Sequence, residues 1–279
     1  MFYVVLAILA ITGINVLMRY TTVRSRTVWG VMAMNYLTGA VVSLILYISG
    51  DSPPPGQITI MLAVVAGLLY IGGMSLNMKT MSLRGASITA SVVQLSVLIP
   101  IGLSMLLYGE QLRVTQLAGV CLAVVSLPLL TSRPGVDLRK LNGEAVPYML
   151  ATLVVVGFAQ FTSKVFISSG LGMERDGFFA VLFTFASMIT IPIALRHRGE
   201  ITRSDLPLGV GVGAFNILGN RFILEALKTL PGSVVFPLNG SGALVLVTAA
   251  SVVLFREKVS RLNAAGILVT LVAVVLLNI

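Results

Sequence analysis

The sequence predicts an all-α integral membrane protein with ten transmembrane helices, arranged as two inverted five-helix repeats. Three observations carry this prediction. Of the 279 residues, 57% are hydrophobic and only 10% are charged, which is far too little charge for a water-soluble domain of this size. Apolar runs recur along the whole chain at close to the ~20 residues that a helix needs to cross the hydrocarbon. The second half of the chain also repeats features of the first.

The first half contains five apolar runs separated by short polar segments. No basic segment precedes the first run and no small-residue cleavage site follows it, so we expect it to be a retained span rather than a signal peptide. Between the second and third runs, Pro53, Pro54 and Pro55 exclude a helix because consecutive prolines fix φ and lack N–H donors. The predicted helices are residues 2–18, 28–48, 58–76, 86–107 and 114–130.

A polar segment of mixed charge, residues 133–144, is the predicted linker between a first repeat, 1–132, and a second repeat, 145–279. The second repeat again shows five apolar runs. The predicted helices are residues 146–166, 178–195, 206–227, 233–255 and 262–277.

Corresponding motifs in the two halves support the repeat. Glu110 follows Tyr108-Gly109 and precedes Gly119, and Glu257 follows Phe255-Arg256 and precedes Gly266, at a constant offset of 147 residues. Because each half has an odd number of spans, the halves enter the membrane from opposite faces. Inverted repeats of this kind place a substrate site at their interface near the midplane.

The basic residues predict the orientation. Of the 19 lysines and arginines, 14 fall on one side of the predicted spans and four on the other, with Arg221 inside a span. The positive-inside rule assigns the richer side to the cytoplasm. We therefore expect cytoplasmic odd-numbered loops, both termini outside, and a multi-pass location in the cell membrane, which in a bacterium is the cytoplasmic membrane.

The five-plus-five helices, the Gly109-Glu110 to Gly119 and Glu257 to Gly266 motifs, and the polar–basic pairs that end the first and sixth spans resemble the EamA-type members of the drug/metabolite transporter superfamily. The resemblance covers essentially the whole chain. It implies solute transport by alternating access, often export of amino acids, metabolites or drugs, without ATP. It also implies cytoplasmic termini, which disagrees with the charge count; the orientation expected here follows the charge count.

Ionisable residues inside spans are costly and face a cavity or a partner. Arg221 is therefore a candidate contact for the solute, with Glu225, one turn later, as its ion-pair partner or as a proton-coupling carboxylate. The alternative is a self-satisfied pair that only supports helix packing. Lys164 is a candidate at the end of the sixth span, where it could equally extend to the interface. Glu110 and Glu257 fit a structural role near the N-terminal ends of the fifth and tenth helices, where the helix dipole favours carboxylates.

Amides inside the spans form the larger group of candidate solute contacts, because an amide both donates and accepts hydrogen bonds. Their alternative role is hydrogen bonding between helices, which is common in membranes. Asn216 and Asn220 share one face of a helix by their spacing. The candidate amides are Asn15, Asn35, Asn77, Gln94, Gln160, Asn216, Asn220 and Asn239.

Helix-breaking residues occur at similar depths in the two halves. Pro100 in the fourth span, and Pro237 and Gly240 in the ninth, are expected to interrupt their helices. Interruptions at corresponding places of two repeats expose backbone groups that line a binding site. The alternative is a kink without a functional role.

The sequence disfavours enzymatic and cofactor-dependent functions. The chain has one histidine and one cysteine, Cys121, so a histidine-rich or thiolate metal site is not expected. It lacks the Gly-x-Ser-x-Gly motif and a phosphate-binding P-loop. We expect no enzyme activity, no cofactor and no metal. The net charge of +9 follows from topology, so nucleic acid is not an expected partner.

The sequence thus predicts a secondary active transporter for a small polar metabolite that is amino acid-like, anionic or zwitterionic, or drug-like, and that is exported. Its expected partners are the solute and the lipid bilayer. The alternatives are a flippase for a lipid or lipid-linked headgroup on the same fold, and a non-transporting membrane partner of another protein. The solute, proton coupling, and the choice between monomer and homodimer stay open.

Overall fold

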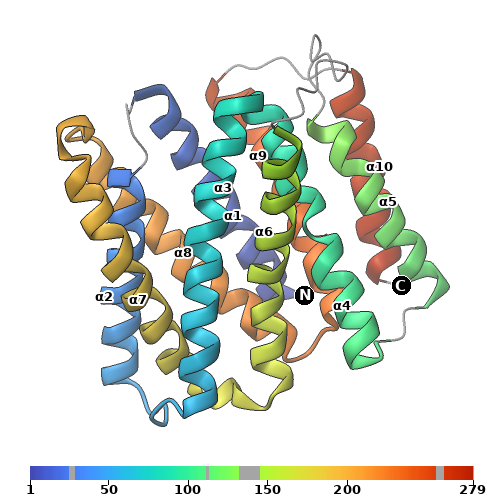
Figure 1. The fold of residues 1–279 in the computed structure, drawn as a ribbon. Helices are drawn as coiled ribbons and strands as arrows, with labels where there is room; N and C mark the ends of the chain where they lie inside the picture. Colours follow the sequence, from blue (N-terminus) through green and yellow to red (C-terminus); the bar gives the residue numbers. More distant parts are fainter. Residues whose placement is uncertain (25–28, 111–112, 132–144, 256–260, 279) are drawn as a thin grey trace. The chain divides into compact units, whose positions relative to one another are not determined.

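The computed structural model of the chain describes residues 1–24, 29–110, 113–131, 145–255 and 261–278, and every regular element in these ranges is helical (Figure 1). Two short 3-10 turns, η1 (Leu171–Glu174) and η2 (Arg198–Glu200), flank α7. The α-helices of the described residues are α1 (Phe2–Arg24), α2 (Trp29–Ser49), α3 (Gln57–Leu95), α4 (Leu98–Tyr108), α5 (Val114–Thr131), α6 (Ala145–Ser168), α7 (Arg175–Arg196), α8 (Asp205–Leu227), α9 (Gly232–Phe255) and α10 (Arg261–Asn278).

The ten α-helices confirm the predicted all-α class. Five segments of the described residues are both long and apolar enough to cross a membrane: 29–49, 57–77, 145–168, 171–196 and 205–227. The other apolar helical stretches are shorter, at 10–17 residues. Several buried hydroxyls donate to carbonyls of their own helix. Ser43 donates to the carbonyl of Gly39 at 2.6 Å and Thr190 to that of Ala186 at 2.9 Å, as a chain surrounded by lipid requires.

The chain forms two compact units, and each unit combines helices from both predicted repeats. Unit 1 contains Met1–Ile71 and Val165–Lys228, and unit 2 contains Gly72–Lys164 and Thr229–Ile279. In unit 1, α2 packs on α7 and α8, and α1 packs on α8; in unit 2, α5 packs on α10, and α4 on α9 (Figure 1). The pairs α2–α7, α4–α9 and α5–α10 join corresponding helices of the two repeats. The boundaries of the repeats and their inverted orientation stay predictions.

Two glycines of α8 set the close packing of unit 1. A Cβ at Gly209 would lie 2.7 Å from the carbonyl oxygen of Val31, and a Cβ at Gly213 would lie 2.6 Å from that of Asn35. Real side chains do not approach backbone atoms so closely, so only glycine allows α8 to contact α2 here. Gly209 and Gly213 are four residues apart, the spacing at which small residues bring membrane helices together.

A cluster of aromatic side chains forms another part of this core. The rings of Phe166 and Phe178 have centroids 4.4 Å apart, and Phe179 continues the cluster to Phe183 with centroids 6.1 Å apart. All four phenylalanines are almost completely buried. Such rings bury a large apolar area and add specific ring–ring contacts. The start of α7 is therefore fixed rigidly against the end of α6.

The helix breaks differ from the predicted ones. Helical hydrogen bonding continues from the third predicted span through residues 77–85, because this segment contains no proline and is rich in methionine, lysine, leucine and arginine, which are good helix formers. The break comes later, at Ser96–Val97. There the carbonyl of Ser96 lacks an N–H donor at Pro100 and accepts a bond from Ile99 at 3.1 Å instead. Pro100 thus interrupts the helix, but one turn upstream of its own position.

The predicted interruption of the ninth span was wrong. α9 runs without a break from Gly232 to Phe255, through Pro237 and Gly240. Pro237 lies only five residues after the start of the helix, so its ring conflicts with a carbonyl of the first turn, at Ser233. A helix end adapts to this conflict more easily than a helix interior does.

Candidate functional site

A ladder of three amides and one tyrosine crosses the helices of unit 1. The Tyr70 hydroxyl donates to Oδ1 of Asn220 at 2.5 Å. The amide nitrogen of Asn220 donates to Oδ1 of Asn216 at 2.7 Å and to its carbonyl oxygen at 2.9 Å. The amide nitrogen of Asn216 donates to Oδ1 of Asn35 at 3.0 Å. We call these four residues the amide ladder; they connect α3, α8 and α2.

The helix packing explains why these side chains meet. Asn216 and Asn220 lie one turn apart on one face of α8, as predicted. Gly213, on the same helix, allows α8 to approach the backbone of α2 at Asn35. Asn35 is 7% exposed. The sequence thus identified three of the four members; Tyr70 was missed, although a tyrosine hydroxyl inside a span needs a partner and is itself a signal.

All donations in the amide ladder run toward Asn35. Within the described part of the chain, the amide nitrogen of Asn35 itself donates no hydrogen bond. Hydrogen bonds that run in one direction polarise each other, so the last donor of such a series is strengthened. The ladder therefore presents an unused donor at its end, suited to a carbonyl, carboxylate or hydroxyl oxygen.

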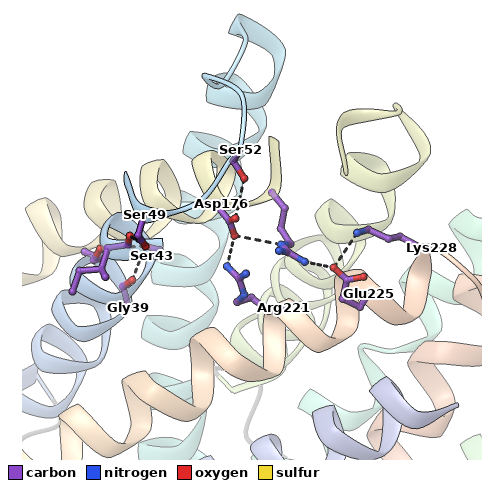
Figure 2. Close-up of polar contacts among 11 residues, drawn as sticks. Gly39, Ser43, Ser49, Ser52, Asp176, Arg221, Glu225 and Lys228 are labelled. Carbon is purple, nitrogen blue, oxygen red and sulfur yellow. Dashed lines mark hydrogen bonds and ion pairs between the residues drawn. The ribbon is translucent and has the colours of Figure 1, made fainter. Parts of the chain in front are cut away.

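Five side chains of alternating charge lie at the junction of α7, α8 and the 51–56 loop in unit 1. Asp176 accepts a hydrogen bond from Ser52 at 2.9 Å and forms an ion pair with Arg221 (Figure 2). Arg175 contacts Asp176 at 3.3 Å and pairs with Glu225, which also binds Lys228 at 2.9 Å. We call Arg221, Asp176, Arg175, Glu225 and Lys228 the charge chain.

The expected ion pair between Arg221 and Glu225 is not formed. The two residues are one turn apart on α8, but Arg221 pairs with Asp176 of α7, and Glu225 pairs with Arg175 and Lys228. Side chains of a neighbouring helix can replace a partner on the same helix. Here the start of α7 supplies the carboxylate of Asp176 to Arg221 and the guanidinium of Arg175 to Glu225. Glu225 thus forms ion pairs, but with Arg175 and Lys228 instead of Arg221; its role as a proton-coupling carboxylate stays a prediction.

Asp176, like Tyr70, was not among the candidates predicted from the sequence. It is 7% exposed at the first turn of α7. The chain has only 10 acidic residues, so an aspartate at the edge of an apolar run was a candidate counterion for a membrane-embedded arginine. The position of this acidic residue directly before an apolar span was the feature of the sequence that could have identified it.

In unit 2, Glu110 connects three elements. Its carboxylate pairs with Lys164 of α6 at 2.5 Å and accepts hydrogen bonds from the backbone of Gly232 and Ser233, each at 3.0 Å, and from the Ser233 hydroxyl at 2.7 Å. Glu110 was predicted to act structurally at the start of the fifth helix. It acts structurally, but at the N-terminus of α9, whose free N–H groups it satisfies.

Burial and hydrogen bonding have opposite effects on the pKa of the Glu110 carboxyl group. Burial raises the pKa of its carboxyl group, but the bonds from Lys164, Ser233 and Gly232 outweigh burial and leave the pKa below its ordinary value. Lys164 is also held over the ring of Tyr108, at 5.2 Å from the ring centroid. Lys164 therefore reaches a carboxylate and an aromatic ring rather than only the membrane interface.

The remaining candidates are scattered. Gln160 donates to the hydroxyl of Ser96 at 3.1 Å, beside the break before Pro100. Asn15 is exposed and donates to its own helix at Ile11. Asn77 is partly buried on α3. Oδ1 of Asn239 is buried without a hydrogen-bond partner among the described residues.

Some residues discussed from the sequence cannot be placed. The side chain of Gln94, all of Arg256 and Glu257, and the predicted linker 133–144 lie outside the described residues. Within the described ranges, no group of three or more histidine, cysteine, aspartate or glutamate side chains could hold a metal ion.

Comparisons with known proteins agree with this fold. A model of the EamA-like transporter family matches residues 1–132 and 144–279. A curated protein of Haemophilus influenzae (strain ATCC 51907 / DSM 11121 / KW20 / Rd), described as an uncharacterized protein, is 24% identical over 97% of this chain and 95% of its own length. A solved crystal structure of a protein shares the fold, with a TM-score of 0.78 at 17% identity over 99% of this chain and 94% of that chain.

The chain therefore belongs to the EamA-like transporter family. It is a multi-pass membrane protein, and this family consists of transporters of the drug/metabolite type rather than enzymes.

Proposed function

We propose that the protein is a secondary active transporter that exports a small polar solute across the cell membrane by alternating access, and that the amide ladder is part of its solute site. The solute is amino acid-like, anionic or zwitterionic, or drug-like. The observation that carries the proposal is the unused donor of Asn35 at the end of a polar ladder inside apolar helices of a transporter family.

Amide side chains suit a transport site, which must both bind its solute and release it. Each amide donates and accepts, so a solute can replace an internal hydrogen bond with an equivalent external one. Hydrogen bonds between membrane helices are worth only about 0.6 kcal/mol on average, so this exchange costs little. A donor at the end of the ladder favours a solute with an exposed acceptor, which a carboxylate provides.

We also propose that Arg221 contacts the solute, independently of the amide ladder. Its ion pair with Asp176 supports an additional structural role. Transport of every tested solute by Arg221→Ala at the wild-type rate would remove Arg221 from the solute site.

The first experiment is a ligand screen followed by transport in liposomes. Purified protein is screened by thermal shift against amino acids, organic anions, nucleosides and cationic drugs, since a ligand of the folded state raises the apparent stability. Flux of each hit is then measured in wild type, Asn216→Ala and Asn220→Ala. Gln57→Ala, which removes an exposed amide at the start of α3, is the matched control.

We expect the two ladder variants to weaken binding of the hit about tenfold, the effect of losing about 1.4 kcal/mol, and Gln57→Ala to behave as wild type. Wild-type binding and flux in both ladder variants would disprove the proposed site. Flux that depends on the pH difference across the liposome membrane would identify proton coupling.

A further inference from the structure

A pocket of about 270 Å³ lies beside the charge chain, at the end of unit 1 that carries the 51–56 loop. Its lining includes two carboxylates, Asp51 and Asp176, and two cations, Arg175 and Lys228. We propose that this charged pocket binds a small zwitterion, with the solute carboxylate at Arg175 and Lys228 and its ammonium group at Asp51.

Both cations retain unused hydrogen-bond donors. An arginine has five N–H donors and a lysine has three. Arg175 uses Nε toward Asp176 and Nη1 toward Glu225, and Lys228 makes its contact with Glu225. Nη2 of Arg175 and the other protons of Lys228 can therefore bind a carboxylate without breaking the charge chain. The side chains of Arg175 and Lys228 are 24% and 39% exposed, so a solute in water reaches them.

The acidic side of the pocket is also available. Asp51 is exposed and forms no ion pair with any residue that the structure describes. It thus offers a carboxylate to an ammonium group, while Asp176 is already engaged by Ser52, Arg175 and Arg221.

Charge balance selects the class of ligand. The lining carries as many cations as carboxylates, so a ligand with a net charge meets as much repulsion as attraction. A zwitterion places each of its groups at the opposite charge and satisfies both sides. The volume is slightly below the usual range for small-molecule pockets, which fits a small solute. Met173, an exposed residue of the lining, offers an apolar surface to the side chain of the solute.

This site goes beyond the proposed function, because none of its residues belongs to the amide ladder. Binding is measured by isothermal titration calorimetry on the purified full-length protein, with glycine, L-serine and L-leucine as zwitterions. Isoamylamine lacks the carboxylate of leucine, and 4-methylpentanoate lacks its ammonium group. The variants are Lys228→Gln and Asp51→Asn, and the control is Arg198→Gln, which removes an exposed cation from η2.

We expect at least one zwitterion to bind, its Kd to rise at least tenfold in Lys228→Gln and Asp51→Asn, and Arg198→Gln to match wild type. For leucine, both analogues should bind at least tenfold more weakly. Absence of binding by all three zwitterions, wild-type affinity in both pocket variants, or equal affinity for an analogue would overturn the proposal.

The same titrations in an Asn220→Ala background separate the two sites. Binding that survives in this background and is weakened by Lys228→Gln supports the charged pocket whether or not the ladder transports solute. Binding lost in Asn220→Ala but unchanged in Lys228→Gln overturns the charged pocket and leaves the proposed function standing.

Discussion

At the scale of single residues, we expect the loss of one member of the ion pair between Arg221 and Asp176 to have a large energetic effect. Its side chains are 17% and 10% exposed. Removing one member of a buried pair leaves the other charge without compensation, and this costs about 3–5 kcal/mol. The pair therefore fixes the last turns of α8 against the start of α7.

Asp176→Asn should lower the free energy of unfolding by about 3–5 kcal/mol. Thermal unfolding in detergent measures the change, and Glu200→Gln, an exposed acidic residue near His197, should shift the unfolding temperature little. Adding Arg221→Gln to Asp176→Asn should recover part of the loss, because both charges are then gone. An unchanged unfolding temperature in Asp176→Asn would show that the pair is not a net stabiliser.

Glu110 is expected to make the stability of the folded protein depend on pH. Its pKa is lowered in the folded protein, so the folded state binds its proton less readily than the unfolded state, where a glutamate has a pKa of about 4.3. The resulting stabilisation is fully present above about pH 5 and is lost as the pH falls through the lowered pKa of the folded state.

We therefore expect Glu110→Gln to unfold at a lower temperature than wild type at pH 7, and the difference to shrink below about pH 4.3. The measurement is thermal unfolding between pH 3 and pH 8. A difference that stays constant over this range would exclude the carboxylate charge as its source.

At the scale of elements, the contact between α8 and α2 positions the amide ladder. Gly213 touches the backbone of α2 at Asn35, the same residue that ends the ladder. A methyl group at Gly213 must push the helices apart, because the nearest atom is a carbonyl oxygen. The same group at Gly211 would meet only the end of the flexible Leu17 side chain, at 2.8 Å.

Gly213→Ala should destabilise the protein by about 1–3 kcal/mol, the usual cost of overpacking, and should weaken solute binding along with it. Gly211→Ala should cost less than about 1 kcal/mol, since alanine is the better helix former and offsets part of any strain. Unfolding and ligand-binding measurements on both variants provide the comparison. Equal stability of the two variants would mean that α8 and α2 do not need this close contact.

At the scale of the whole molecule, orientation is the main prediction. A cysteine at Pro54, in a Cys121→Ser background, should react with an impermeant maleimide in intact cells, because the charge count places the 51–56 loop outside. A cysteine at Gly199 should react only after permeabilisation. The reverse pattern would show that the chain follows the orientation implied by the family resemblance.

The sequence was sufficient for the features that depend on local composition. It predicted ten helices because apolar runs and prolines act locally, and it predicted the shared face of Asn216 and Asn220 from helical spacing alone. It also identified the family, whose model matches nearly the whole chain.

Only the tertiary structure decided which polar groups meet. Arg221 pairs with Asp176, 45 residues away, and not with Glu225 on the next turn. Glu110 binds the start of α9, 122 residues away. The physical reason is that apolar helices carry few features that specify their neighbours, so the partner of each rare polar side chain depends on packing details such as Gly213 against the α2 backbone.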